Sequence, residues 1–312
     1  MQRTVSLLIL LQTFLPCLLL AQADSINIDL LQKAFKLDEV VIADTRISYD
    51  VPNFIRMVIH DKTFYKAFQN LRTVNYSAYN NIRIFDKKGG LKSKYYSETE
   101  QAIQDKCRTM QFLSVEHSPN FFDRNNDYNF YTAKLFDLIF FTKGKVCQSS
   151  QKDDVQHHTQ AVSSQDQQYI AQLKQLIFDP GDAIDLPFIK GKSAIFAEKM
   201  MPYYDYTLSS KIYNDETDCY VLSVVAKQPQ SGQTIIKKLE TYFNKNDFQI
   251  VARNYELQQS TLVFDYNVKM AIKLTRLGDI YLPAVIEYDG NWDIPLQPRE
   301  TGKFTAQFYN FH

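Results

Sequence analysis

The stretch LVFDYNVKMAIKL, from Leu262 to Leu274, decides the fold that we expect of this chain. Apolar residues occupy every second position, which is the period of a β-strand with one buried face. At about 3.3 Å per residue the strand would reach roughly 43 Å, more than twice the common strand length. Long antiparallel strands with one apolar face belong to a strongly curved sheet or an open barrel.

The rest of the second half continues this strand pattern. Pro283 predicts that its strand is an edge strand or carries a bulge, because proline has no backbone donor. Asn244–Asp247 and Gly278-Asp279 are turn-forming, and Asp289-Gly290 predicts a further hairpin. The expected strands cover Tyr204 to Ile212, Tyr220 to Val224, Thr234 to Phe243, Phe248 to Leu257, Ile280 to Tyr288 and a last strand with Phe304, Ala306 and Phe308.

The start of the chain predicts helices. Apolar residues recur at helical spacing from Ser25 to Lys36 and again from Val51 to Asn70, and both ranges are therefore expected to be amphipathic helices. The β-branched run from Leu37 to Ile42 predicts a short strand between them.

A β-hairpin is expected next. Two alternating runs, Asn75 to Phe85 and Leu91 to Ile103, flank a turn that ends in Gly89-Gly90. Met110 to Val115 predicts one more strand. The apolar residues of Phe130 to Phe141 run together, so their spacing fits a buried strand and a short helix equally well.

Residues 148–168 are rich in Gln, Ser and Asp, and this composition predicts a flexible polar loop. A helix is expected after it, from Tyr169 to Phe178. We therefore expect an N-terminal helical and hairpin part, 24–147, and a C-terminal antiparallel β part, 169–312, that together form one continuous domain.

The first 23 residues have the three parts of a secretory signal peptide. Arg3 is the positive end, an apolar run extends from Val5 to Leu20, and Ala21-Gln22-Ala23 is a small-x-small cleavage site. We expect the mature chain to begin at Asp24 outside the cytoplasm. No later segment is long and apolar enough to span a bilayer.

The formal net charge is zero, which argues against nucleic acid or an anionic membrane surface as an electrostatically attracted partner. Three of the four cysteines follow the signal peptide, so at most one intramolecular disulfide can form. Which of Cys107, Cys147 and Cys219 pair stays open.

Residues typical of catalytic and metal sites are scattered. His157-His158 with Asp153-Asp154 is a cluster that could hold a metal, but a flexible polar loop is the better interpretation. Glu98 and Glu100 could form a carboxylate pair, although an exposed strand face is the simpler explanation. No serine lies in a nucleophile-elbow motif. We expect no metal, no cofactor and no catalytic residue, so an enzyme is the less favoured class.

The second half resembles the LolA and RseB type of envelope protein. The resemblance rests on Asp218-Cys219-Tyr220-Val221-Leu222-Ser223-Val224, the hairpin around Asn244–Asp247, the long strand, and Gly278-Asp279-Ile280-Tyr281-Leu282-Pro283. It covers about Met201 to His312. The resemblance implies an α+β fold in which a curved, unclosed antiparallel sheet, a LolA-like open barrel, holds helices on its concave face.

A second resemblance concerns Leu37-Asp38-Glu39-Val40-Val41-Ile42-Ala43, which is similar to a junction in Bacteroidetes-type envelope proteins with carboxypeptidase-like regulatory domains. The β-sandwich that precedes this junction in those proteins has no counterpart here. Both resemblances imply the periplasm or the outer-membrane periphery of a Gram-negative cell.

The expected function is binding rather than catalysis. On a LolA-like half-barrel the ligand would be apolar or amphipathic, such as a lipid or a lipoprotein acyl chain, or the partner would be an envelope protein. The alternatives are a hydrolase with a site of dispersed residues and a structural part of an outer-membrane assembly. Aromatic side chains are the candidate ligand-binding residues, although burial of the helices is the slightly favoured explanation for them. The candidates are Tyr204, Tyr206, Phe243, Phe264, Tyr266, Tyr281 and Phe308.

Overall fold

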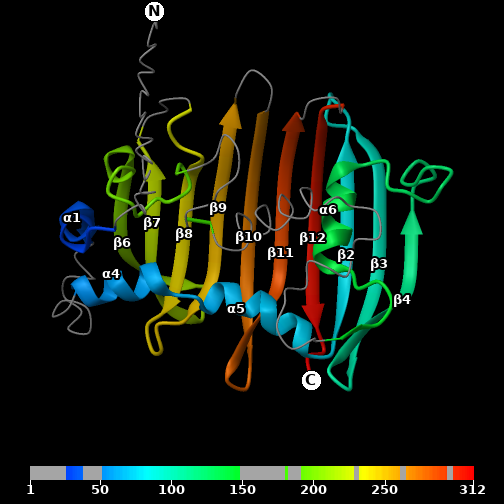
Figure 1. Cartoon of the computed structure of the whole chain (residues 1–312), viewed down its shortest axis with the longest axis horizontal. Coiled ribbons are helices and arrows are strands. Elements are labelled where there is room, and N and C mark those ends of the chain that lie inside the picture. The colour runs from blue at the N-terminus through cyan, green and yellow to red at the C-terminus, as the bar shows by residue number, and fades with distance from the viewer. Residues whose placement is uncertain are drawn as a thin grey trace, which may run out of the picture.

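Twelve strands form one sheet in the order β1-β6-β7-β8-β9-β10-β11-β12-β2-β3-β4-β5 (Figure 1). The computed structural model describes residues 26–37, 51–147, 180–181, 191–227, 232–260, 265–293 and 298–312. Neighbouring strands are antiparallel except β1 and β6, which are parallel. The sheet is curved and unclosed, so the predicted fold class is confirmed.

The strands of both halves of the chain share this sheet, because β12 pairs with β2. Their bounds are β1 Phe35–Leu37, β2 Tyr76–Phe85, β3 Leu91–Gln104, β4 Cys107–His117, β5 Val146–Cys147, β6 Tyr204–Tyr213, β7 Thr217–Ala226, β8 Ile236–Asn244, β9 Ile250–Ser260, β10 Asp265–Leu277, β11 Ile280–Asp293 and β12 Glu300–Tyr309.

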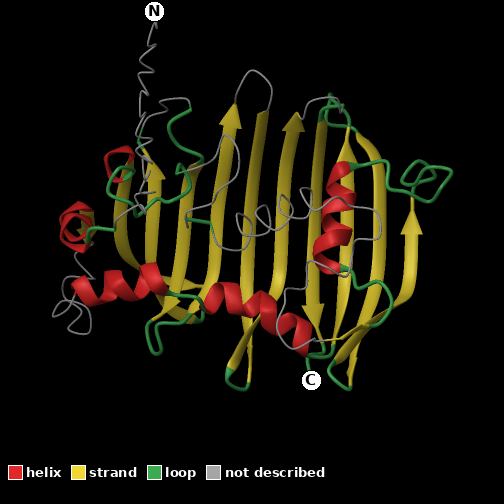
Figure 2. Cartoon of the chain, viewed as in Figure 1, coloured by secondary structure: helices red, strands yellow, loops and turns green. Residues whose placement is uncertain are grey.

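Helices α4, α5 and α6 lie against one face of the sheet, which we call the concave face, and α1 lies at the edge beside β6 (Figure 2). Helices α4 and α5 cross the strands near one end of the sheet, and α6 runs along β12 and β2. Their bounds are α1 Ile28–Ala34, α4 Val51–His60, α5 Thr63–Asn70 and α6 Tyr131–Phe140, with short 3-10 helices η1 Leu71–Thr73 and η3 Met201–Tyr203.

Strand β10 has the alternation that the sequence predicts. Tyr266, Val268, Met270 and Ile272 are buried in the core, whereas Asn267, Lys269 and Lys273 are exposed. The strand is central, because β9 and β11 pair along it. Leu262 and Phe264 lie outside the described residues.

Strand β11 confirms one prediction and corrects another. The register between β10 and β11 shifts at Lys273 and Leu274, which oppose Val285 and Pro283, so Pro283 lies at the predicted bulge. The hairpin predicted at Asp289-Gly290 is wrong, because both residues lie inside β11. A Cβ on Gly290 would overlap the Tyr288 ring, so this glycine makes room for a side chain and not for a turn.

The single helix predicted from Val51 to Asn70 is also wrong, because the structure has two helices with a break at Asp61 and Lys62. Asp61 lies just before the second start. Its carboxylate accepts hydrogen bonds from the Thr63 backbone at 2.8 Å and from the Thr63 hydroxyl at 3.1 Å.

The open alternatives of the sequence are settled at two places. Phe130 to Phe141 forms helix α6, and the cysteine pair is Cys107 with Cys147, while Cys219 is a buried free thiol. The predicted hairpin is β2 and β3. The signal peptide, the loop 148–168 with its histidines and the helix 169–178 lie outside the described residues.

Candidate functional site

The concave face carries most of the predicted ligand-binding residues. Five of the seven candidates are buried in the core there, on strands β6, β8, β10 and β12. Tyr281 lies apart at the rim of the sheet, and Phe264 is outside the described residues. The five are Tyr204, Tyr206, Phe243, Tyr266 and Phe308.

Helix α4 covers the part of this face formed by β7 and β8. Phe54 is the contact residue, with its ring centroid 5.9 Å from that of Tyr220 and 5.8 Å from that of Phe243, both edge-on. Such pairs add about 0.5–1.5 kcal/mol to the free energy gained by burying their area. Phe243 therefore serves to hold the helix.

Helix α6 covers β12. Phe136 packs edge-on against Phe304 at 5.0 Å, and Phe140 contacts Phe308 at 6.1 Å. The start of the helix is fixed by Glu300, whose carboxylate accepts the backbone N–H groups of Tyr131 and Thr132 at 2.8 and 2.7 Å. This carboxylate satisfies two amides that the first turn leaves unpaired and matches the helix dipole.

Between these helices the face has an aromatic cluster that the sequence analysis missed. Trp292 stacks on Tyr266 at 5.3 Å, receives the edge of Tyr131 from α6 at 5.9 Å, and donates its indole N–H to the Tyr288 hydroxyl. The alternation of buried residues continues through Gly290 to Trp292, but a turn predicted at Gly290 hides it.

Strand β6 contributes Tyr204 and Tyr206. The Tyr206 hydroxyl donates to the carbonyl oxygen of Ile195, and its ring stacks on Phe35 at 5.5 Å. The Tyr204 hydroxyl is buried and has no hydrogen-bond partner among the residues that the structure describes. Burial raises the pKa of both phenols well above the usual value of 10, so both are neutral donors at physiological pH.

The concave face also contains a buried cation. Arg253 of β9 lies with its guanidinium carbon 4.3 Å from the ring centroid of Phe64 in α5, and its Nε donates to the Thr241 hydroxyl at 3.2 Å. Cation–π contact of this kind is stronger where water is removed. The face is therefore aromatic with a few polar groups set into it.

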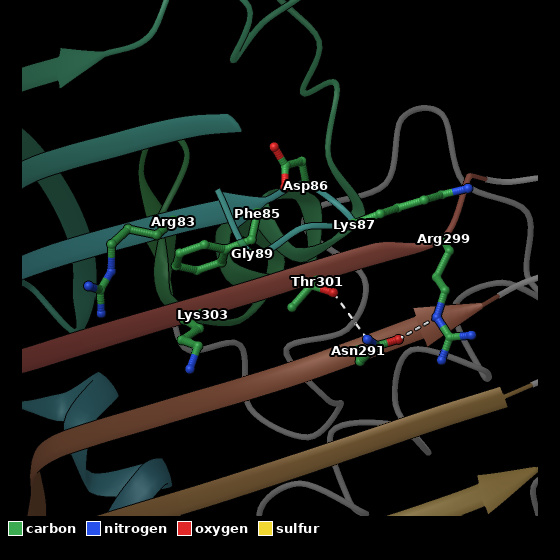
Figure 3. A pocket seen from close by; sticks show the side chains of 9 residues that line it. All are labelled: Arg83, Phe85, Asp86, Lys87, Gly89, Asn291, Arg299, Thr301 and Lys303. Carbon is green, nitrogen blue, oxygen red and sulfur yellow. Dashed lines mark hydrogen bonds between the residues drawn. The ribbon is translucent and has the colours of Figure 1, made fainter. Parts of the chain in front are cut away.

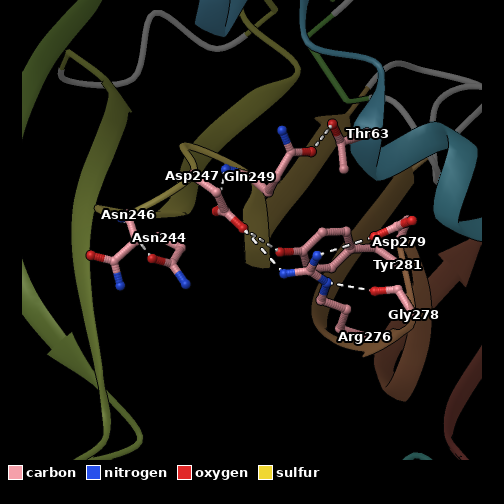
Figure 4. Close-up of polar contacts among 9 residues, drawn as sticks. All are labelled: Thr63, Asn244, Asn246, Asp247, Gln249, Arg276, Gly278, Asp279 and Tyr281. Carbon is pink, nitrogen blue, oxygen red and sulfur yellow. Dashed lines mark hydrogen bonds and ion pairs between the residues drawn. The ribbon is translucent and has the colours of Figure 1, made fainter.

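Tyr281 belongs to a polar cluster at the rim, where the β8–β9 and β10–β11 turns meet (Figure 4). Its hydroxyl donates to Asp247 at 2.9 Å, and burial together with that carboxylate raises its pKa to about 12. Arg276 donates to the Gly278 carbonyl at 2.7 Å, and the Thr63 hydroxyl donates to the side-chain carbonyl oxygen of Gln249 at 2.8 Å. The cluster ties both turns to the start of α5.

The remaining candidates for chemistry are exposed or have structural partners. Glu98 accepts a hydrogen bond from the Tyr309 hydroxyl at 2.7 Å, and Glu100 is exposed. Buried Asp137 is paired with Lys143 at 2.6 Å and accepts from the Tyr128 hydroxyl at 3.1 Å. Within the described ranges no three His, Cys, Asp or Glu side chains gather as metal ligands.

No described helix is long and apolar enough to cross a bilayer.

Comparison with known proteins gives distant structural similarities. No protein-family model and no curated protein matches the sequence. A DUF1329 family protein from Desulfovibrio piger aligns at 11% identity over 80% of this chain and 92% of that chain, with a TM-score of 0.26. An outer membrane lipoprotein-sorting protein domain from Vibrio parahaemolyticus aligns at 8% identity over 80% and 92%, also with a TM-score of 0.26.

Lipovitellin, solved in a study of lipid–protein interactions, aligns at 6% identity over 77% of this chain and 25% of its own length, with a TM-score of 0.27. Scores of this size carry no argument about function, so the function is inferred below from the chain's own residues.

Proposed function

We propose that this chain is an exported, non-enzymatic protein of the cell envelope that binds an apolar or amphipathic ligand, such as a lipid or a lipoprotein acyl chain, on the concave face. The supporting feature is a large aromatic surface with isolated hydrogen-bonding groups. An acyl chain gains roughly 25 cal/mol for each Å² of apolar surface that it removes from water. Its polar end needs a donor.

The buried hydroxyl of Tyr204 is the observation that carries the proposal. A buried donor without a partner costs about 1–3 kcal/mol of stability. The Tyr204 hydroxyl therefore destabilises the protein when no ligand is bound. A ligand oxygen that accepted its hydrogen bond would recover that free energy. Because Tyr204 is only 1% exposed, the ligand must displace side chains that cover the face.

The chemistry of the face favours binding over catalysis. The concave-face phenols whose pKa is raised, Tyr204, Tyr206, Tyr255 and Tyr288, stay protonated at neutral pH, so they donate hydrogen bonds and do not act as bases. A hydrolase would instead need a carboxylate beside a histidine in such a site.

A fluorescent fatty acid titrated into the mature chain tests this proposal. We expect saturable binding, and about tenfold weaker binding by Tyr204→Phe, which corresponds to the loss of one hydrogen bond of about 1.4 kcal/mol. Tyr204→Phe should not lower the melting temperature. Tyr242→Phe is the matched control, since Tyr242 packs against Tyr213 on the other face, and it should bind as the wild type does. Absence of saturable binding by the wild type would refute the proposal.

A further inference from the structure

The convex face, opposite the helices, carries an ordered row of charged residues. Cross-strand pairing places one residue from each of six adjacent strands in line, from β9 to β3. In spatial order the row reads Glu256, Lys269, Asp289, Lys303, Arg83 and Lys94.

The first four positions alternate in sign and form ion pairs. Lys269 lies 3.3 Å from Glu256, and Lys303 lies 2.6 Å from Asp289. Opposite charges on directly opposed residues stabilise a sheet, whereas like charges there destabilise it. The first part of the row therefore needs no ligand.

The alternation fails at the other end of the row. Arg83 stands directly between Lys303 and Lys94, so three cations follow one another on neighbouring strands. Directly opposed residues have Cβ atoms about 4.5–5.5 Å apart. The side chains of Arg83 and Lys94 form no ion pair and no hydrogen bond with the described residues. This end of the row carries repulsion that an anion would relieve.

A hollow adjoins these cations, between the β2–β3 loop and the neighbouring ends of β11 and β12 (Figure 3). Its volume of about 590 Å³ falls within the range of small-molecule sites. Arg83, Lys87, Arg299 and Lys303 line it, and Phe85 lies within it. The Lys303 ammonium is 5.9 Å from the Phe85 ring centroid.

The acidic residue of the hollow is held by its own loop. Asp86 turns its carboxylate to its own loop, where Oδ1 accepts the backbone N–H groups of Lys88 at 2.8 Å and Gly90 at 2.9 Å. Arg299 is held by Asp265 at 3.0 Å and by Asn291 at 2.8 Å. Arg83 and Lys87 thus remain as the cations of the hollow that no described carboxylate engages.

We propose that this hollow binds a phosphate-bearing ligand. A guanidinium presents a fork of donors that matches phosphate oxygens, and lysine adds a point charge. The Thr301 hydroxyl accepts a hydrogen bond from Asn291 at 3.1 Å, which leaves its own proton to donate to the ligand. The zero net charge gives no long-range attraction, so recognition depends on these contacts. The site is separate from the concave face.

Thermal unfolding of the mature chain tests this proposal, with inorganic phosphate compared with chloride at equal ionic strength. We expect phosphate to raise the melting temperature by about 3 °C at concentrations well above Kd. Arg83→Gln should abolish this rise and, because it removes like-charge repulsion, should not lower the melting temperature in chloride. Lys269→Gln removes the same charge from the paired part of the row and should keep the full response.

A sedimentation experiment distinguishes the two sources of phosphate. Vesicles that contain phosphatidylglycerol should bring down the wild type but not Arg83→Gln if the ligand is a lipid headgroup. A phosphate response without vesicle binding identifies a soluble phosphate compound. No response to either probe, or an equal loss in Arg83→Gln and Lys269→Gln, would overturn the proposal. These outcomes leave the acyl site on the concave face untouched.

Discussion

Thr132 of α6 occupies the space that a side chain at Gly302 of β12 would need. A Cβ on Gly302 would lie 2.8 Å from Thr132 Cβ and 2.9 Å from its Cγ2. The glycine therefore lets the helix start rest on the sheet, where Glu300 of the same strand caps it. Helix α6 is positioned by these neighbouring residues of β12.

We predict that Gly302→Ala destabilises the protein by about 1–3 kcal/mol, because the added methyl group overpacks this contact. Thr132→Ala alone should cost little, since the buried Thr132 hydroxyl has no described partner. The double variant should be more stable than the sum of the single effects predicts, by at least about 0.5 kcal/mol. Urea unfolding of all four proteins measures this coupling, and strictly additive effects would mean that the two residues do not meet.

A second prediction concerns the register of β10. Val268→Asp places a charge without a partner in the buried face and should cost several kcal/mol. Lys273→Asp introduces an aspartate on the exposed face of the same strand. It should change the free energy of unfolding by about 0.5 kcal/mol. Similar shifts in the urea midpoint for both variants would contradict the assigned faces.

The buried tyrosines predict a loss of stability at alkaline pH. Burial raises the pKa of these phenols above the value of about 10 that they have when unfolded, so above that pH the unfolded chain loses protons that the folded chain keeps. Stability should be constant up to about pH 9 and then fall by about 1.4 kcal/mol per pH unit for each such residue. The residues are Tyr76, Tyr204, Tyr206, Tyr255 and Tyr288.

Urea unfolding across this pH range measures how steeply the free energy of unfolding falls with pH. Tyr204→Phe should reduce this slope by about 1.4 kcal/mol per pH unit. A free energy of unfolding that stays level to pH 11 would show that these phenols are accessible in the folded protein.

Cys219 should be inert in the native protein. Its side chain is fully buried, and burial raises the pKa of the thiol to about 11, so almost none of it is the reactive thiolate at neutral pH. Iodoacetamide should label no cysteine of the mature native chain, one after denaturation, and three after denaturation with reduction of the Cys107–Cys147 disulfide. Rapid labelling of the native chain would place Cys219 at the surface.

The strands β2, β3 and β10 were predictable from the sequence because each depends on local alternation. In β10 one face is buried along most of its length, so the period of two is complete from Tyr266 to Ile272. The hairpin of β2 and β3 was found in the same way. Its turn takes one positive φ angle from Gly89, at 82°, while Gly90 has an ordinary backbone conformation.

What could not be predicted depends on contacts between distant segments. Gly290 resembles a turn residue in the sequence, and only the structure shows the Tyr288 ring beside it. The apolar residues of α6 surround most of the helix, so packing against β12, and not periodicity, determines that this segment is helical. The cysteine pair follows from the register of β4 and β5, which places Cys107 opposite Cys147.

For the candidate site, the alternation of aromatic residues was sufficient where strands were regular. It placed Tyr204, Tyr206 and Tyr266 on the concave face. Tyr281 was included with them, but it is only half-buried, unlike Leu282 and Ile286 of the same strand, and it faces the rim cluster. The pairing of Arg83 with two cations was invisible, because it depends on the order of three strands.

Quenching of Trp292 by a brominated fatty acid is the most direct test of ligand binding on the concave face. Trp292 is the only tryptophan of the chain, and it stacks on Tyr266 among the buried residues of that face. We predict saturable loss of Trp292 fluorescence with the brominated acid, and no comparable loss with the unbrominated acid of equal length. Saturable binding of the acid without any quenching of Trp292, or no binding at all, would contradict this prediction.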